Sequence, residues 1–412
     1  MMGRWIVGCT AAVLFLEVCP VQANWPQWLG PNRTGVSEET GLLTTWPKGG
    51  PKVVWESPLG QGFSGISVAD GRVYTMFSSG EDEFVICLDE RTGKELWRFK
   101  TGAKLYEGQG GNGPRSQPTV EGDRVYVLGA EGWLYALGAK DGKKLWVVDL
   151  YDGLGSSIPK FGFATSPIIE GDLLLLEAGT RRGTFLALDK TDGKVKWASQ
   201  EDIVAYSSPI AVDIAGVRQV VFLSGNGAVG LSPTDGRVYW RFPWVTSYDL
   251  NIATPIFVPP DQIFISSGYD HGAALLQVEK RKGGLGAKKI WENRGMKNHF
   301  STSVLHGDYL YGFDNAILKC IEAKTGKEQW KHRGFGKGAL IYADGHLIIM
   351  SDTGKLGLVE ATPEGYREKG VVQVLSGRCW TGPTLANGKV FVRDMKKMVC
   401  LELAGNGGSV NP

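Results

Sequence analysis

The phrase CLDERTGKELW, residues 87–97, recurs along the chain and decides the fold. It returns as ALGAKDGKKLW (136–146), ALDKTDGKVKW (187–197) and CIEAKTGKEQW (320–330). Tryptophans of this kind lie 39 to 51 residues apart, at Trp55, Trp97, Trp146, Trp197, Trp240, Trp291 and Trp330. A period of about 40–50 residues, with four short strands in each repeat, is typical of β-propeller blades.

One repeat, residues 116–146, makes the unit visible. Its short apolar runs PTV, RVYVL, WLYAL and KKLW are separated by turns that contain Gly and Asp. Helical periodicity is missing from nearly the whole chain after the N-terminus, so we expect strands throughout. A glycine stands four residues before the tryptophan in most copies, where we expect a positive φ. The tryptophan offers a flat apolar surface that can pack on the next blade.

The repeats predict eight blades. Segments that begin inner strands are expected near Phe63, Ser116, Thr165, Ser207, Thr254, Thr302, Ala339 and Thr381. The last repeat, residues 379–403, lacks an outer strand, while the segment KVVW (52–55) stands alone before the first repeat. We therefore predict an all-β, eight-bladed propeller of four-stranded antiparallel blades. The N- and C-terminal strands would share one blade and leave no exposed edge.

The chain outside the repeats is short. Residues 1–23 combine a basic start, an apolar run and small residues ending at Ala23, which predicts a signal peptide and a periplasmic or secreted protein. The Cys9 sequence IVGC resembles a lipobox but lies too near the N-terminus for a lipoprotein signal. Residues 24–50, rich in Trp and Pro, are expected to form an extended strap on the propeller, or else a partner-binding arm. Residues 51–412 are expected to form the propeller.

Composition limits the partners. The net charge is +2 and no basic block is present, so nothing favours nucleic acid. No membrane-spanning segment is expected after signal cleavage, and we expect a monomer. Four cysteines follow residue 23 without a C-x-x-C pair, so no zinc site is expected. Cys87, Cys320 and Cys400 occupy the position of Ala136 and Ala187 in other repeats, which predicts small, buried, inert residues.

The repeated A-x-D-x-x-T-G-x-x-x-W pattern resembles the tryptophan-docking motif of the pyrroloquinoline quinone (PQQ)-like propeller family. That family includes quinoprotein alcohol dehydrogenases and the propeller subunit of the outer-membrane β-barrel assembly machinery. The stretches WPQWLGPNRTG (25–35) and NHFSTSVLHGDYLYGFD (298–314) resemble secreted members from planctomycete-type bacteria. The resemblance covers nearly everything after residue 50 and implies the fold more strongly than an activity.

Loops that join one blade to the next surround one mouth of a propeller channel, and here two of them are long, 99–115 and 148–164. Long loops on a rigid scaffold commonly carry binding residues. The candidate ligand-binding residues stand just before the inner strands: Arg115, Tyr206, Asn251, His299, Lys337, Arg378 and Trp380. The cations would create a positive field, to which His299 could add charge at lower pH, and the aromatic rings could stack on a planar anion.

Two functions follow from these residues. The first is an extracytoplasmic binding or scaffold protein that uses the loop-rich face and the channel mouth to hold a protein or a small anionic ligand. The second, implied by the resemblance, is a PQQ- and Ca²⁺-dependent dehydrogenase acting on alcohols or sugars. Such an enzyme needs convergent carboxylate and amide oxygens. Glu107, Asp249 and Asn251 could supply oxygens, but no spacing singles them out, no catalytic residue is identified and no metal site is predicted.

Overall fold

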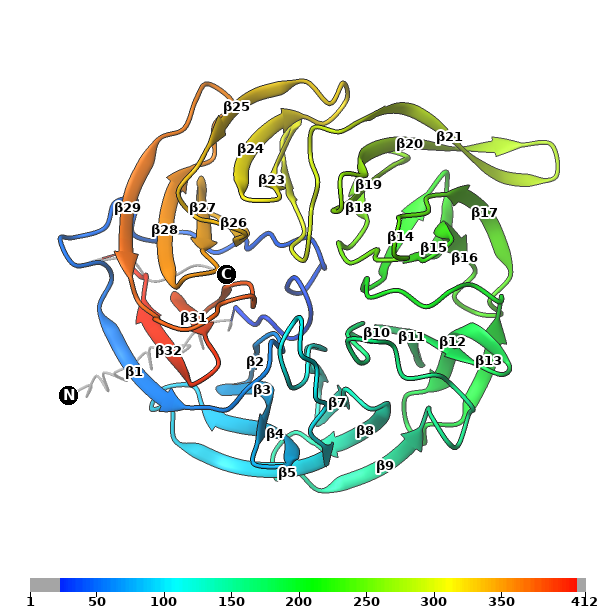
Figure 1. Ribbon diagram of the computed structural model, residues 1–412, viewed down its shortest axis with the longest axis horizontal. Helices are drawn as coiled ribbons and strands as arrows, with labels where there is room; N and C mark the ends of the chain where they lie inside the picture. The colour runs from blue at the N-terminus through cyan, green and yellow to red at the C-terminus, as the bar shows by residue number, and fades with distance from the viewer. Residues whose placement is uncertain (1–22, 406–412) are drawn as a thin grey trace, which may run out of the picture.

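A computed structural model describes residues 23–405. In them 32 strands form eight four-stranded antiparallel sheets arranged around a ring (Figure 1). The predicted eight-bladed propeller is confirmed. No helix in this part of the chain is long and apolar enough to cross a membrane. The predicted signal peptide lies outside the described residues, apart from Ala23.

The strands run from the channel outward in each blade. Blade 1 contains β2 (Ser67–Ala69), β3 (Arg72–Ser79), β4 (Asp82–Asp89) and β5 (Glu95–Ala103); blade 2 contains β6 (Thr119–Glu121), β7 (Arg124–Leu128), β8 (Trp133–Gly138) and β9 (Lys144–Asp149). Blade 3 contains β10 (Ile168–Glu170), β11 (Leu173–Thr180), β12 (Gly183–Asp189) and β13 (Val195–Ser199); blade 4 contains β14 (Ile210–Ile214), β15 (Val217–Ser224), β16 (Gly227–Leu231) and β17 (Val238–Pro243). Blade 5 contains β18 (Ile256–Val258), β19 (Gln262–Ser267), β20 (Gly272–Arg281) and β21 (Gly284–Asn293); blade 6 contains β22 (Val304–His306), β23 (Tyr309–Asp314), β24 (Ile317–Glu322) and β25 (Glu328–His332). Blade 7 contains β26 (Ala339–Ala343), β27 (His346–Met350), β28 (Lys355–Glu360) and β29 (Glu368–Gln373); blade 8 contains β30 (Thr384–Ala386), β31 (Lys389–Arg393), β32 (Lys397–Glu402) and β1 (Val53–Pro58).

The ring closes in blade 8, as predicted. Strand β1 pairs with β32, with Trp55 opposite Cys400, so the two ends of the propeller meet in one sheet. The inner strand of blade 1 begins at Ser67, four residues later than expected from Phe63. The segment before β2 forms a hydrogen bond to the next blade instead of pairing within its own sheet. The Ser64 hydroxyl donates to the Ser116 carbonyl, which precedes the inner strand of blade 2, at 2.7 Å.

The repeated tryptophan joins neighbouring blades. Trp97 donates its indole N–H to the Ala139 carbonyl of blade 2 at 3.1 Å. A Cβ built on Gly142 would lie 2.6 Å from the Trp97 ring, and Gly142 has φ of +67°. Two features therefore require glycine at position 142: a Cβ would collide with the Trp97 ring, and the backbone has a positive φ. Equivalent bonds to a backbone carbonyl of the next blade are made by Trp55, Trp146, Trp197, Trp291 and Trp330.

Trp240 is the exception among the seven. Its indole N–H donates to the side chain of Gln219 in its own blade. In blade 5 the strands β20 and β21 continue past the point where other blades turn, with Val278 still paired to Ala287. The turn whose carbonyl would accept the Trp240 bond is therefore absent there.

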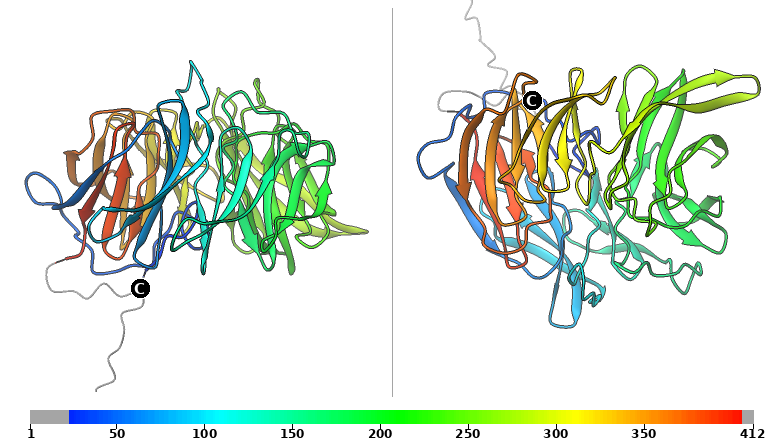
Figure 2. Two further views of the ribbon diagram at one scale, coloured as in Figure 1. Left: turned by 90° about the horizontal axis from the view of Figure 1, so that it is seen from below. Right: turned by 45° about the horizontal axis from the view of Figure 1, so that its top comes forward.

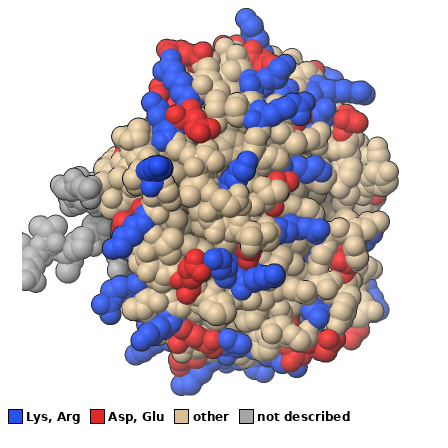
Figure 3. Space-filling view, turned by 60° about the vertical axis from the view of Figure 1, so that its left-hand side comes forward, with Lys and Arg blue, Asp and Glu red and all other residues tan. Residues whose placement is uncertain are grey.

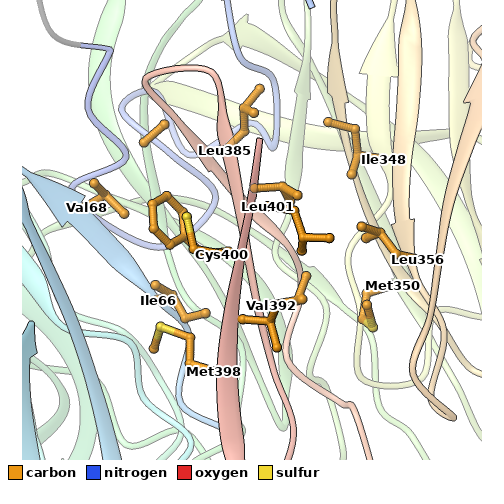
Figure 4. Close-up of a cluster of buried hydrophobic side chains, with 14 of the residues drawn as sticks. Ile66, Val68, Ile348, Met350, Leu356, Leu385, Val392, Met398, Cys400 and Leu401 are labelled. Atoms are coloured by element: carbon orange, nitrogen blue, oxygen red, sulfur yellow. The ribbon is translucent and has the colours of Figure 1, made fainter. Parts of the chain in front are cut away.

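The hydrophobic core lies between the blades. Figure 4 shows one such layer, where Ile66 and Val68 of blade 1, Val392 and Cys400 of blade 8, and Met350 of blade 7 come together. All four cysteines of the described chain are free and buried. Burial raises the pKa of Cys87 and Cys320 to about 12, so their thiols are inert at neutral pH, as expected.

Candidate functional site at the channel mouth

The loop of residues 104–118, which joins blade 1 to blade 2, reaches over one mouth of the channel. It rises above the disc in cyan in the left panel of Figure 2. Its shape depends on Glu107, whose carboxylate accepts the backbone N–H groups of Gln109 at 3.0 Å, of Gly110, and of Gly111 at 3.2 Å. Desolvation pulls the pKa of Glu107 upward, but these N–H groups and the Arg115 charge outweigh it and lower the pKa below its usual value.

Two guanidinium groups hold the same loop. Arg115 donates to the carbonyls of Gly113 at 2.9 Å and Gly111 at 2.8 Å, and Arg378 donates to that of Gly110 at 2.8 Å. Desolvation lowers the pKa of Arg115, which the nearby Glu107 carboxylate partly opposes. Neither arginine makes an ion pair within 4.0 Å in the part of the chain that the structure describes. The Glu107 carboxylate offsets part of the Arg115 charge, whereas the exposed Arg378 leaves its charge available to an anion from outside.

Aromatic rings line the channel beneath these cations. Trp380 stacks on Phe63 with ring centres 5.1 Å apart and lies 4.9 Å from Phe300. The guanidinium of Arg378 lies over Trp380 at 4.7 Å, and that of Arg115 lies over Phe63 at 5.4 Å. A cavity of about 100 Å³ opens here, lined chiefly by Trp28, Phe63, Arg115, Tyr206, Phe300 and Trp380.

His299 and Lys337 form a second part of the mouth. The His299 ring lies 4.8 Å from that of Tyr269, and its Nδ1 is buried without a hydrogen-bond partner among the described residues. Burial, followed by the charge of Lys337, lowers the pKa of His299 to about 4. A pKa of about 4 means that His299 would add positive charge only well below the range of an ordinary histidine.

Asn251 lies apart from the cavity. It is fully buried, and its amide N–H groups donate to the carbonyls of Ser224 at 2.7 Å and Trp244 at 3.0 Å. Its oxygen accepts the Ser267 hydroxyl at 2.6 Å, and its backbone carbonyl accepts the N–H of Tyr206 at 3.0 Å. Asn251 thus holds the loop that carries Tyr206. Of the seven candidates, Arg115, Tyr206 and Trp380 line one cavity, Arg378 covers its edge, and His299 and Lys337 adjoin it.

The opposite end of the channel is closed by the N-terminal strap. Trp28 lines the cavity from below and donates its indole N–H to the Thr254 hydroxyl at 2.8 Å. Arg33, buried beside it, donates to the carbonyls of Pro209 at 2.8 Å, Ser166 at 3.1 Å and Pro167. Figure 1 shows this dark-blue segment inside the ring. The channel is therefore closed at the strap end and accessible from the end that carries the linking loops.

Three of the lining residues, Phe63, Phe300 and Trp28, were not among the candidates predicted from the sequence. Phe63 and Phe300 stand directly before Ser64 and Ser301, as Tyr206 and Trp380 stand before Ser207 and Thr381. This repeated aromatic–Ser/Thr pair ahead of the inner strand is the signal that would have found them. Trp28 lies outside the repeats, and nothing in the local pattern places it in the channel.

The residues at the mouth do not fit PQQ with Ca²⁺. Across residues 23–405, no three His, Cys, Asp or Glu side chains come together in an arrangement that could hold a metal ion. The oxygens of Asn251 and Glu107 are bound by the protein's own hydroxyl and N–H groups. The cavity, about 100 Å³, is also smaller than the roughly 300–1,000 Å³ of pockets for drug-sized ligands.

Fold, repeat and mouth together define a β-propeller of the PQQ-like repeat class. The chain belongs to the family described as outer membrane protein assembly factor BamB, whose model matches residues 81–332. Outer membrane protein assembly factor BamB of Burkholderia pseudomallei is 25% identical over 374 residues, which is 84% of either chain. The quinoprotein alcohol dehydrogenase PedH of Pseudomonas putida is 26% identical over 165 residues, 38% of this chain and 26% of that one. The crystal structure of BamB from Moraxella catarrhalis has a TM-score of 0.62 at 16% identity, covering 86% of this chain and all of that one, which shows a shared fold.

Proposed function

We propose that this protein is an extracytoplasmic, non-catalytic binding propeller that holds a protein partner on its loop-rich face. The channel mouth would accept an anionic group of that partner. The N-terminal sequence and the assembly factors among its relatives support a place outside the cytoplasm and a protein as the partner.

The observation that carries the proposal is an arc of exposed apolar side chains around the mouth. Tyr248 is 68% exposed, Tyr106 62%, Val245 57% and Ile203 48%. All four lie on loops that join consecutive blades, the same set of loops that carries Arg115 and the exposed Arg378. Aromatic residues and arginine are enriched in protein interfaces, and contiguous exposed apolar side chains mark such surfaces.

The test places a photo-crosslinking amino acid at single positions in the native host. Positions 106 and 248 probe the loop-rich face, and positions 96 and 145 on the outer strands β5 and β9 serve as exposed controls (Leu96 and Leu145 are each 48% exposed). We expect one crosslinked partner of defined mass from the two face positions and none from the controls. The same adduct from all four positions, or none from the face, would contradict the proposal.

A further inference from the structure

The hairpin of β20 and β21 leaves the disc. Each strand has ten residues, and pairing continues to Arg281 opposite Gly284. In blade 6 the same two strands have six and five residues. Figures 1 and 2 show the blade 5 hairpin projecting beyond the rim.

This extension changes the way in which blades 4 and 5 are joined. It replaces the turn that would accept the Trp240 bond, so the junction between blades 4 and 5 lacks the carbonyl contact that the other six tryptophans make. Close to the turn, Leu285 and Ala287 of β21 pack against the blade 4 core around Ile214. The hairpin is therefore anchored on blade 4 through one face of β21.

The tip carries a concentrated positive charge. Residues 279–289 contain five cations, Lys280, Arg281, Lys282, Lys288 and Lys289, and one carboxylate, Glu279. The net charge of this segment is +4, whereas that of all 412 residues is +2. The other residues together therefore carry a net charge of −2. On the side of the molecule seen in Figure 3, by contrast, Lys and Arg alternate with Asp and Glu.

The charges at the tip are only partly neutralised. Glu279 is shared between Lys288 at 2.6 Å and Arg281 at 3.4 Å, and Lys289 pairs with Glu292 at 2.6 Å. Lys280 and Lys282 are exposed and form no ion pair within the described residues. The exposed residues around the turn, 280–284, are Lys, Arg and Gly.

We propose that this hairpin binds the surface of a bilayer containing anionic phospholipid. Clusters of four to eight Lys and Arg side chains are attracted to such surfaces. A projecting finger without a pocket suits a flat, repeating array of phosphates better than a single small anion. The hairpin joins the third and fourth strands of its blade, so its tip lies toward the face that carries the strap, opposite the linking loops (Figure 2). A molecule bound in this way keeps its mouth accessible.

The test measures co-sedimentation of the mature chain with vesicles of phosphatidylglycerol and phosphatidylcholine, and with phosphatidylcholine alone, at low salt. The variant Lys280→Gln/Lys282→Gln removes two charges without breaking an ion pair. Its control, Lys94→Gln/Lys140→Gln, removes two exposed lysines from turns on the same face of blades 1 and 2. We expect binding only to the anionic vesicles, weakened about 25-fold by the hairpin pair, about fivefold per charge, and weakened far less by the control pair.

Several results would overturn the proposal. One is an equal loss of vesicle binding in the Lys280/Lys282 and Lys94/Lys140 variants. The others are equal binding of the unaltered chain to neutral and anionic vesicles, or no binding of it to either. Lysines on a projecting strand can also prevent edge-to-edge pairing of sheets. In that case the hairpin variant would self-associate in size-exclusion chromatography while vesicle binding stayed unchanged. Arg378→Gln at the mouth should leave vesicle binding intact, so this proposal and the proposed function fail independently.

Discussion

The two ends of the central channel use arginine in opposite ways. At the strap end Arg33 is buried, and its guanidinium is enclosed by three backbone carbonyls and the Gln27 side chain. At the mouth Arg378 is exposed and binds a single loop carbonyl. The first arrangement satisfies nearly every donor and locks the strap in place. The second leaves donors and charge available. The comparison indicates that the strap end serves stability and the mouth serves recognition.

The largest effect should come from removing Arg33. Arg33→Met leaves the carbonyls of Ser166 and Pro209 buried without donors, at a cost of about 1–3 kcal/mol for each unsatisfied group, while the Pro167 carbonyl keeps the Thr119 hydroxyl as a donor at 2.7 Å. We expect a loss of about 3 kcal/mol or more in the free energy of unfolding, measured by urea denaturation. Arg378→Met, the matched change at the mouth, should stay within about 0.5 kcal/mol. If both variants lost a similar amount of unfolding free energy, the claim that Arg33 serves stability and Arg378 serves recognition would be contradicted.

Trp28 tests the closed end more finely. Trp28→Ala removes a half-buried ring that lines the channel cavity, and we expect about 2 kcal/mol of destabilisation. Trp28→Phe keeps a ring but loses the indole bond to Thr254, which should cost about 1 kcal/mol. Thermal unfolding of both variants checks the order. An unchanged midpoint for Trp28→Ala would mean that the strap does not hold the channel closed.

Two carboxylates that hold linking loops should respond to pH in opposite directions. Burial raises the pKa of Glu177, whose oxygen accepts the Ala205 N–H at 2.8 Å, from 4.5 to about 8. Its contribution to stability is full below its unfolded pKa near 4.5 and is lost as pH rises through about 8. The pKa of Glu107 is lowered, so its contribution is present above the unfolded pKa and is lost as pH falls.

We therefore expect Glu177→Gln to flatten the pH dependence of the unfolding midpoint between pH 5 and 8. Glu107→Gln should act only on the acidic side of that range. Each unit of pKa shift corresponds to about 1.4 kcal/mol. A Glu177→Gln profile that runs parallel to that of the unaltered chain would contradict this assignment.

The smallest change is expected when PQQ and Ca²⁺ are added: the unfolding midpoint should not move. A ligand at 100 times its Kd would add about 2.7 kcal/mol to the free energy of unfolding. Because no cluster of metal-binding side chains is found among residues 23–405, the oxygens of Glu107 and Asn251 are bonded within the protein, and the cavity is about 100 Å³, we expect no midpoint shift with both added. A Ca²⁺-dependent shift that Arg378→Ala or Lys337→Ala abolishes would revive the dehydrogenase hypothesis.

The blades could be predicted from sequence because each repeat is local: its strands, its turns and the glycine four residues before its tryptophan lie in one short stretch, such as residues 116–146. Trp380 and Tyr206 were found because the repeat aligns them at the mouth. Asn251 occupies an aligned position as well, but its side-chain direction depends on Ser224, Trp244 and Ser267 in the folded blade. Trp28 could not be placed, since its partner Thr254 is 226 residues away.

The claim that the loop-rich mouth is the binding face is tested most directly by measuring the Kd of the crosslinked partner. The measurement compares variants at the mouth of the channel with variants at its strap end. Buried aromatic and arginine contacts at an interface are commonly worth 2 kcal/mol or more, about 30-fold in Kd. We predict that Tyr248→Ala and Arg378→Ala each weaken binding by about that factor. Leu145→Ala on the rim and Trp28→Phe at the closed end should bind as the unaltered chain does. Loss of affinity in the strap-end variant with full affinity in the mouth variants would contradict the claim that the loop-rich mouth is the binding face.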